Sequence, residues 1–411
     1  MNSESLRIKN AAAVYPIEPV TPPAANFVVI PVFDENSYIR ATLESVKKAL
    51  DNSPQPVAVI LVLNEPASAS AGARQHNREL LESLQKNDGK YDGGLAVGRE
   101  LFYINLLDKE IKEKFRTVGN ARKTGFDGAI LQSDGKVTDQ KGLLFSLDAD
   151  TLVSEKYFVN AFEHFKMFPE NAGAVFNFEH RLEANHTLQL AAMRYEIYLL
   201  DYALKMHRSG SHYGFWTIGS AFACTVRDYL RCGGMRRHAA GEDFYFLQAL
   251  RKVGKVGIIS EVSVYPAGRI SDRVPFGTGP AIARQLTGEL PGLYNPRQFE
   301  LLRDFFDNCR NSDYDSLADN IMSFASGELA GFLEKQKFSE IWSKIVKNTP
   351  RDHKKLLDAL HTYCDGFFIL KFSHFLEEQN PGEFGRIKMY ADRDLAAELD
   401  RLRREVMDFF G

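Results

Sequence analysis

The chain has 411 residues, of which 44% are hydrophobic and 26% are charged, a composition typical of globular proteins. Its length exceeds that at which a single hydrophobic core usually stops growing, so more than one domain is expected. The formal net charge of −3 excludes a strongly basic surface that would attract nucleic acid, and no nucleic-acid partner is expected.

The first 25 residues favour an extended arm over a packed element, because they contain Pro16, Pro19, Pro22 and Pro23. The opening MNSESLRIKN lacks the basic start and apolar segment of a signal peptide. No stretch reaches the roughly 18 consecutive apolar residues of a membrane span. We therefore expect a cytoplasmic protein without a transmembrane segment, and peripheral contact with a membrane stays open.

Strand-like and helical patterns alternate from about residue 26 to residue 266. Apolar runs typical of buried strands lie at 27–33, 57–63, 101–107, 143–147, 172–178 and 256–264. Helical patterns fall between several of them, as at 37–50 and 155–168. This alternation predicts an α/β sheet that is covered by helices on both faces.

After Pro291 the strand pattern stops and apolar residues keep helical spacing, as in Leu356, Leu360 and Phe367. We expect an all-helical C-terminal appendage. The predicted domains are an extended arm (1–25), an α/β domain (26–290) and a helical domain (291–411). The helical domain could complete the packing, form an oligomer interface or bind an acceptor.

Two carboxylates, Asp148 and Asp150, directly follow the apolar run at 143–147. Such groups are costly to bury without a partner. Open α/β sheets bind ligands at the carboxyl ends of their strands, and Mg²⁺ and similar ions prefer oxygen ligands. The pair therefore predicts a divalent metal site. The alternatives are that Asp150 caps a helix beginning near Ser154, or that Asp148 pairs with an arginine.

Two other charged motifs flank this pair in the sequence. Arg122 and Lys123 follow a Gly-Asn turn, and they could neutralise a diphosphate or form a solvated basic turn. Glu242 and Asp243 open an apolar helix. They could serve only as charges favoured by the helix dipole, or supply a general base.

Five stretches occur in the order found in family-2 glycosyltransferases of the GT-A fold. They are VVIPVFDENSYIRATLESV, GNARKTGFDGAI, LLFSLDADT, GSAFACTVRDYLRCGGM and GEDFYFLQALRKVG. The chain resembles this family over roughly residues 26–266. The resemblance implies a GT-A-like, Rossmann-like sheet that is mixed, mostly parallel and flanked by helices.

The resemblance also implies a role for individual residues. Asp148 and Asp150 would be the metal-binding pair that grips the donor's diphosphate, with Mg²⁺ or Mn²⁺ as the metal. Asp243 would be the general base, with Glu242 beside it. The remaining positions would be Pro31, Phe33, Glu35 and Arg122 at the donor, and Gly219 and Ser220 at the acceptor.

The chain departs from the family pattern at three places. One is the family's ARN motif, which reads Ala121-Arg122-Lys123 here. Asn64 follows the second strand where many relatives have an acidic residue, and its amide could replace a carboxylate in binding the donor's base. The Q-x-x-R-W signature of processive synthases is missing, since Gln248 is followed by ALRK. We therefore expect a non-processive enzyme.

The stretch AGRISDRVPFGTG (267–279) matches no motif of the family. Its arginines, Arg269 and Arg273, lie close to flexible glycines. The stretch could close over a donor or bind an acidic acceptor. The alternative is a surface loop that joins two domains.

Together these features predict a metal-dependent glycosyltransferase of the hexosyltransferase type. It would transfer a sugar from a UDP- or GDP-sugar to an unidentified acceptor hydroxyl, with inversion and with Asp243 as general base. One alternative is a nucleotidyltransferase acting on a sugar phosphate, but the acidic PVFDENSYI replaces the Gly-rich, basic loop that such enzymes carry after the first strand. The other alternative is a catalytically silent nucleotide-sugar-binding protein, against which the carboxylates argue.

Overall fold

The structure is a computed structural model that describes residues 26–86, 89–91, 93–108, 111–132, 142–181, 185–237, 241–271 and 277–410. These residues divide into two compact units. The first comprises the described residues up to Ala192, Thr217–Leu286 and the end of the last helix from Met407; the second comprises Met193–Trp216 and Thr287–Val406. The arm expected at 1–25 lies outside the described residues, and the expected domain boundaries stay a prediction.

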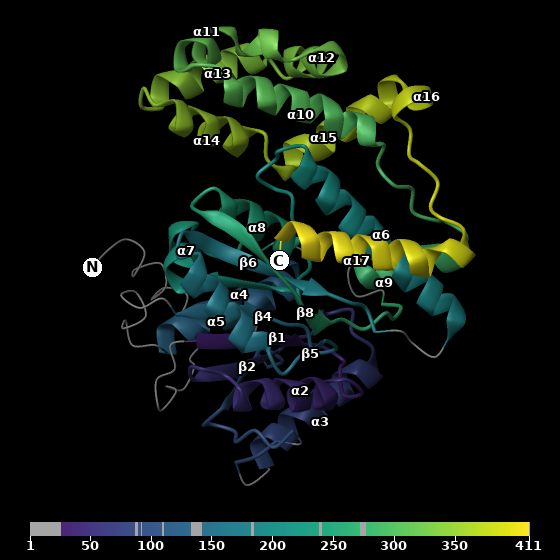
Figure 1. Cartoon of the computed structure of the whole chain (residues 1–411). Helices are drawn as coiled ribbons and strands as arrows, with labels where there is room; N and C mark the ends of the chain where they lie inside the picture. The colour runs from purple at the N-terminus through teal and green to yellow at the C-terminus, as the bar shows by residue number, and fades with distance from the viewer. Residues whose placement is uncertain are drawn as a thin grey trace. The chain divides into compact units, whose positions relative to one another are not determined.

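The first unit is built on an eight-stranded sheet of order β3-β2-β1-β4-β7-β6-β8-β5 (Figure 1). Its strands are β1 (Asn26–Val32), β2 (Val57–Leu63), β3 (Leu101–Asn105), β4 (Leu143–Ser146), β5 (Leu152–Val153), β6 (Asn171–Phe178), β7 (Phe222–Thr225) and β8 (Lys255–Tyr265). The pairs β1–β2, β1–β4, β2–β3 and β6–β8 are parallel. The pairs β4–β7, β6–β7 and β5–β8 are antiparallel, so the sheet is mixed.

The expected α/β class is confirmed, and a strand forms at each of the six predicted runs. All seven residues of β2 are buried, which is why its sequence reads as a continuous apolar run without alternation. The sequence did not indicate β5 and β7. These strands have two and four residues, too few to show a period of two.

Helices cover both faces of this sheet. They are α2 (Ile39–Asp51), α3 (Ala71–Lys86), α4 (Val118–Gln132), α5 (Tyr157–Met167), α7 (Val226–Arg231), α8 (Glu242–Arg251) and α9 (Thr278–Leu286), with the short 3₁₀ helix η1 (Glu113–Phe115). Phe145 of β4 meets Phe158 of α5, with ring centroids 5.1 Å apart. Phe222 of β7 pairs with Ser146, so it points to the other face, where it meets Phe246 of α8 with centroids 5.6 Å apart.

Helix α4 packs directly against β1 and β2 at Gly125. A Cβ atom on Gly125 would come within 2.2 Å of Cγ1 of Val29 and 3.0 Å of Cγ2 of Val62. Any larger residue at position 125 would push the helix away from the sheet. This glycine therefore fixes the helix on which Arg122 lies.

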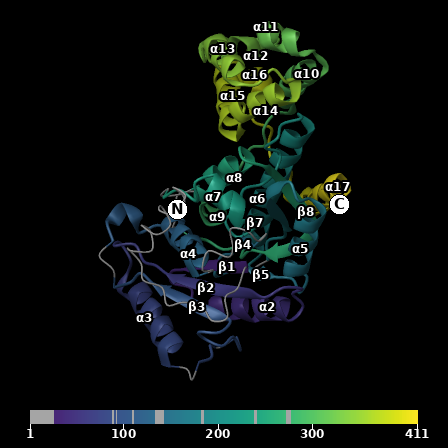
Figure 2. The same cartoon turned by 90° about the vertical axis from the view of Figure 1, so that its left-hand side faces the viewer.

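The second unit is helical and gathers α10–α16 together (Figure 2). These are α10 (Pro296–Asn311), α11 (Tyr314–Phe324), α12 (Gly327–Lys335), α13 (Phe338–Asn348), α14 (His353–Tyr363), α15 (Gly366–Gln379) and α16 (Pro381–Phe384). Parts of α6 (His186–Arg208) and α17 (Leu395–Phe410) also belong to it. The prediction of a helical C-terminal region is confirmed. None of the described helices is long and apolar enough to cross a membrane.

Candidate functional site

The predicted site residues lie at one edge of the sheet. Because β1, β2 and β4 run parallel, the residues that follow each of them emerge at the same edge. Strand β7 runs antiparallel to β4 and pairs its Phe222 with Ser146, so Gly219 and Ser220, which precede β7, lie at this edge too. The strands β6 and β8 run in the direction of β4, and Arg269 follows β8. Pro31 and Phe33, at the end of β1, are half-buried.

Arg122 connects two carboxylates that are far apart in the sequence. Its Nη2 donates to Oδ1 of Asp148 at 2.5 Å, and its Nη1 donates to Oε1 of Glu242. The side chains of Arg122 and Glu242 are 2% and 5% exposed, so this ion pair is buried. The alternative in which Asp148 pairs with an arginine is thus confirmed. Lys123 instead pairs with Asp127 at 2.5 Å.

The carboxyl groups around Arg122 are electrostatically coupled. Burial and the neighbouring Glu242 raise the pKa of Asp243 to about 7, although Arg122 acts to lower it. Loss of hydration also raises the pKa of Asp148 above its ordinary value, against the pull of Arg122. Asp148 still exposes 38% of its side chain. A carboxyl group that titrates near neutral pH can take up and release protons there.

Gly219 and Ser220 border this cluster. A Cβ atom on Gly219 would come within 2.8 Å of Nη2 and 2.9 Å of Nη1 of Arg122, so glycine leaves the space that the guanidinium fills. The carbonyl oxygen of Gly219 accepts a hydrogen bond from Oγ of Ser146 at 2.6 Å. Ser220 is only 1% exposed. The contact of these two residues with an acceptor stays a prediction.

Arg269 makes a second ion-pair cluster with the other predicted metal ligand. Its Nε donates to Oδ2 of Asp150 at 2.8 Å, and its Nη2 donates to Oε1 of Glu35 at 2.5 Å. Its guanidinium carbon also lies 4.4 Å from the ring centroid of Tyr38. Burial acts to lower the pKa of Arg269, but Asp150 and Glu35 raise it overall. Arg273 lies outside the described residues.

Two residues that the sequence analysis missed hold the turn that carries the carboxylate pair. Nη2 of Arg181 donates to the carbonyl oxygen of Asp150 at 2.7 Å. Oγ1 of Thr42 donates to the carbonyl oxygen of Ala149 at 2.8 Å. Helix α5 begins only at Tyr157 and has no side-chain cap, so the alternative in which Asp150 caps a helix near Ser154 is wrong. A basic residue just after β6 was the signal that could have indicated Arg181.

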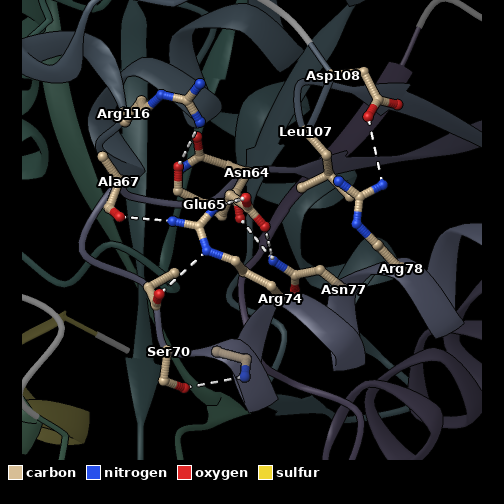
Figure 3. A network of polar contacts seen from close by, with 12 residues as sticks. Asn64, Glu65, Ala67, Ser70, Arg74, Asn77, Arg78, Leu107, Asp108 and Arg116 are labelled. Carbon is tan, nitrogen blue, oxygen red and sulfur yellow. Dashed lines mark hydrogen bonds and ion pairs between the residues drawn. The ribbon is translucent and has the colours of Figure 1, made fainter.

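A polar network surrounds the residues that follow β2 (Figure 3). Glu65 is 3% exposed, and its carboxylate accepts from Nη1 of Arg74 at 2.5 Å and from Nδ2 of Asn77 at 3.4 Å. Nη1 of Arg116 reaches the carbonyl oxygen of Glu65 at 3.3 Å. Both carboxylate oxygens of Glu65 are therefore engaged. Within the described part of the chain, the side-chain amide of the neighbouring Asn64 has no hydrogen-bond partner.

Asn77, on α3, joins the ends of β1 and β2. Its Oδ1 accepts from the backbone N–H of Asp34 at 3.0 Å, and its Nδ2 donates to the carbonyl oxygen of Asn64 at 3.4 Å. Asp34 has a φ of 57°, a left-handed conformation that non-glycine residues seldom adopt. The bond from Asn77 helps to hold this conformation. Asn77 was not identified from the sequence, because its role depends on two strands meeting at one edge.

The carboxylate pair fits a divalent metal in part. Oδ2 of Asp148 has no hydrogen-bond partner among the described residues, and the side chain is partly exposed. Mg²⁺ often binds one or two carboxylates together with substrate phosphates. No group of three or more His, Cys, Asp and Glu side chains that could hold a metal by itself is found in the described ranges.

The sequence matches no model of a known protein family and no curated protein. The structure is similar to that of TarS 1-349 from S. aureus, solved in complex with UDP, with 10% identity, a TM-score of 0.39 and coverage of 78% of this chain and 90% of that chain. It is similar to the mannosyltransferase PcManGT from Pyrobaculum calidifontis, solved with GDP-Man and Mn²⁺, with 12% identity, a TM-score of 0.37 and coverage of 87% and 93%. A mycobacterial protein gives 11% identity, a TM-score of 0.33 and coverage of 70% and 81%. Likenesses at this level establish neither a family nor an activity.

Proposed function

We propose that the chain is a metal-dependent, non-processive glycosyltransferase of the hexosyltransferase type, which inverts the anomeric centre of a UDP- or GDP-sugar donor. The observation that carries the proposal is the link from Asp148 through Arg122 to Glu242. Through this link the carboxylates that follow β4, Asp148 and Asp150, are connected to the residue next to Asp243. The pKa of Asp243, about 7, suits a general base. The ordered motifs that resemble family-2 glycosyltransferases supply the reaction class.

In the proposed reaction, the Asp243 carboxylate accepts the proton of the acceptor hydroxyl as that oxygen attacks the anomeric carbon. The bond from the anomeric carbon to the donor's diphosphate oxygen breaks, and the nucleoside diphosphate leaves with the bonding electrons. Attack from the face opposite the leaving group inverts the anomeric centre. Burial and Glu242 raise the pKa of Asp243, and Arg122 holds Glu242 in position.

The proposed metal ligands are Asp148, through its open Oδ2, and Asp150. A bound Mg²⁺ or Mn²⁺ would offset the negative charge that develops on the leaving diphosphate. Pro31, Phe33 and Glu35 would border the nucleotide at the end of β1. Asn64 would bind the base, because its amide offers both a donor and an acceptor while the carboxylate of Glu65 is engaged.

The test is turnover of a panel of UDP- and GDP-sugars with Mn²⁺ or Mg²⁺, followed as slow hydrolysis when no acceptor is known. We expect Asp243→Asn and Asp150→Ala to abolish turnover. Asp243→Asn should still bind the nucleoside diphosphate, measured as a rise in melting temperature. Nucleotide binding without turnover would contradict the proposal and favour a binding protein. Pyrophosphate release from a nucleoside triphosphate would contradict it in favour of nucleotidyl transfer.

A further inference from the structure

The guanidinium of Arg269 occupies one of the two carboxylate oxygens of Asp150, a proposed metal ligand. It contacts Oδ2 of Asp150 through both Nε and Nη2, at 2.8 Å and 2.7 Å, while Nη2 also reaches Glu35 at 2.5 Å. The side chains of Arg269 and Asp150 are 18% and 19% exposed. Because two like charges repel strongly at such a partly buried site, Arg269 and a divalent cation cannot share this oxygen.

The backbone that carries Arg269 is anchored to the same turn as Asp150. The N–H of Arg181 donates to the carbonyl oxygen of Pro266 at 2.9 Å, and Arg181 forms a parallel bridge with Ala267. A Cβ atom on Gly268 would come within 2.8 Å of the carbonyl oxygen of Arg181, so the segment after β8 packs closely against Arg181. The side chain of Arg181 in turn holds the carbonyl of Asp150. Arg269 can therefore leave Asp150 by rotating its side chain, without a shift of its backbone.

Arg122 and Arg269 differ in how readily each can leave its carboxylate partner. Arg122 is 2% exposed and is held by carboxylates on both sides, so it cannot leave without unpairing a buried charge. Arg269 is also paired with two carboxylates, but only Glu35 is buried, with 6% of its side chain exposed, whereas Asp150 is 19% exposed. Arg269 can therefore give up Asp150 without unpairing a buried charge, provided that it keeps Glu35. Its side chain also contacts the face of Tyr38, which can retain a cation. Arg122 is thus a permanent partner of its carboxylate, whereas Arg269 is suited to exchange.

We propose that Arg269 is an exchangeable cation of the metal site: it neutralises Asp150 and Glu35 in the ligand-free protein, and when a divalent metal binds it yields Asp150, keeps Glu35, and turns its freed N–H groups to the diphosphate of the nucleotide. The second half rests on the proposed glycosyltransferase function. Metal and nucleotide then bind cooperatively, because the diphosphate gives the displaced arginine a new partner. By linkage, each ligand raises the affinity for the other.

The test is a titration of the full chain with Mn²⁺ alone, followed by the electron paramagnetic resonance signal of free Mn²⁺, and repeated with saturating UDP or GDP. We expect Arg269→Gln to bind Mn²⁺ alone about tenfold more tightly than the unmodified protein, because the competing charge is gone. Arg269→Lys keeps the charge and should retain weak binding. Asp150→Asn should abolish Mn²⁺ binding, both in the otherwise unmodified chain and when combined with either Arg269 variant.

The matched control is Arg303→Gln, which removes an arginine of the helical unit whose partner Asp304 is 59% exposed, and it should leave Mn²⁺ binding unchanged. Melting temperatures establish that each variant is folded. An Arg269→Gln protein that is folded but binds Mn²⁺ no better than the unmodified chain overturns the exchange. UDP or GDP should tighten Mn²⁺ binding in the unmodified chain, and much less in Arg269→Gln; equal tightening in both overturns the role at the diphosphate.

The two proposals fail in different ways. If Arg269→Gln tightens Mn²⁺ binding but the unmodified chain turns over no nucleotide sugar, the exchange at Asp150 is supported and the glycosyltransferase function is overturned. If sugar transfer depends on Asp150 while Arg269→Gln leaves Mn²⁺ binding unchanged, the function is supported and the exchange is overturned.

Discussion

Arg122 and Glu242 are 120 residues apart in the sequence, yet Nη1 of Arg122 donates a hydrogen bond to Oε1 of Glu242 in the interior of the α/β unit. Both side chains are almost fully buried. The pair joins the N-terminal half of α4 to the first residue of α8 at the edge of the sheet where β4 ends. Together with the hydrogen bond from Arg122 to Asp148, this contact places the Asp148–Asp150 motif after β4 next to Asp243.

Removing the arginine should destabilise the fold strongly. Arg122→Ala leaves Glu242 buried without its cation, which typically costs about 3–5 kcal/mol. The free energy of unfolding from urea titration measures the effect. Arg303→Ala, at an exposed pair, should change it by no more than about 0.5 kcal/mol. Similar losses in the two variants would show that the buried pair does not stabilise the protein.

Gly219→Ala should disturb the same cluster from its other side. The new Cβ would lie within 3 Å of the Arg122 guanidinium, which has little room to move because it is paired at both nitrogens, so a loss of about 1–3 kcal/mol is expected. Turnover of nucleotide sugars should fall as well. Gly331→Ala is the control, because nothing lies near the new Cβ in helix α12, and it should stabilise by about 0.5–1 kcal/mol. Equal effects in the two variants would contradict the close fit at Arg122.

The free energy of unfolding should depend on pH through the titration of Asp243. Its pKa is about 7 in the folded protein and near 3.8 in the unfolded chain, so the folded state holds this proton more tightly. The resulting stabilisation is complete below about pH 4 and is lost as the pH rises through about 7. Asp243→Asn should remove that loss, so unfolding titrations at pH 5 and pH 8 should show a smaller decrease for the variant. An unchanged difference would mean that the pKa of Asp243 is not raised.

The rate of sugar transfer or hydrolysis should rise with pH through the same range. A general base acts as its ionised form, so kcat/KM should increase up to a midpoint near pH 7 and then level off. The measurement is a pH–rate profile with a nucleotide sugar that is turned over. A profile that is flat between pH 5.5 and pH 8.5 would argue against Asp243 as the base.

Asn77→Ala should destabilise the protein, because Asn77 links the ends of β1 and β2 by hydrogen bonds. It removes the acceptor for the N–H of Asp34 and one donor to Glu65, so a loss of about 2–3 kcal/mol is expected. Nucleotide binding should weaken too, because the left-handed turn at Asp34 loses its support. Gln75→Ala, on the exposed face of α3, is the control and should be nearly neutral in thermal unfolding and in UDP or GDP binding. A neutral Asn77→Ala would show that the turn is held by other contacts.

Local patterns in the sequence were enough to predict the class of the fold and the candidate site residues. Continuous apolar runs such as 57–63 predicted strands, because a strand buried on both faces has no polar side to display. The spacing of apolar residues after Pro291 predicted helices for the same kind of reason, since one stripe of each helix must be buried. Local patterns of this kind are enough to identify elements, and they placed Asp148 and Asp150 at the end of a strand.

The partners of the charged residues depend on how the chain folds in space. Arg122 and Lys123 are equivalent in the sequence, yet one bridges Asp148 and Glu242 while the other pairs with Asp127 on its own helix. Arg269 reaches Glu35 across 234 residues of sequence, because both follow strands that end at the same edge of the sheet. Strand order and direction set these contacts, and no local pattern encodes them. The physical reason is that a buried charge must find a partner through space, and proximity in space follows the sheet, not the order of the chain.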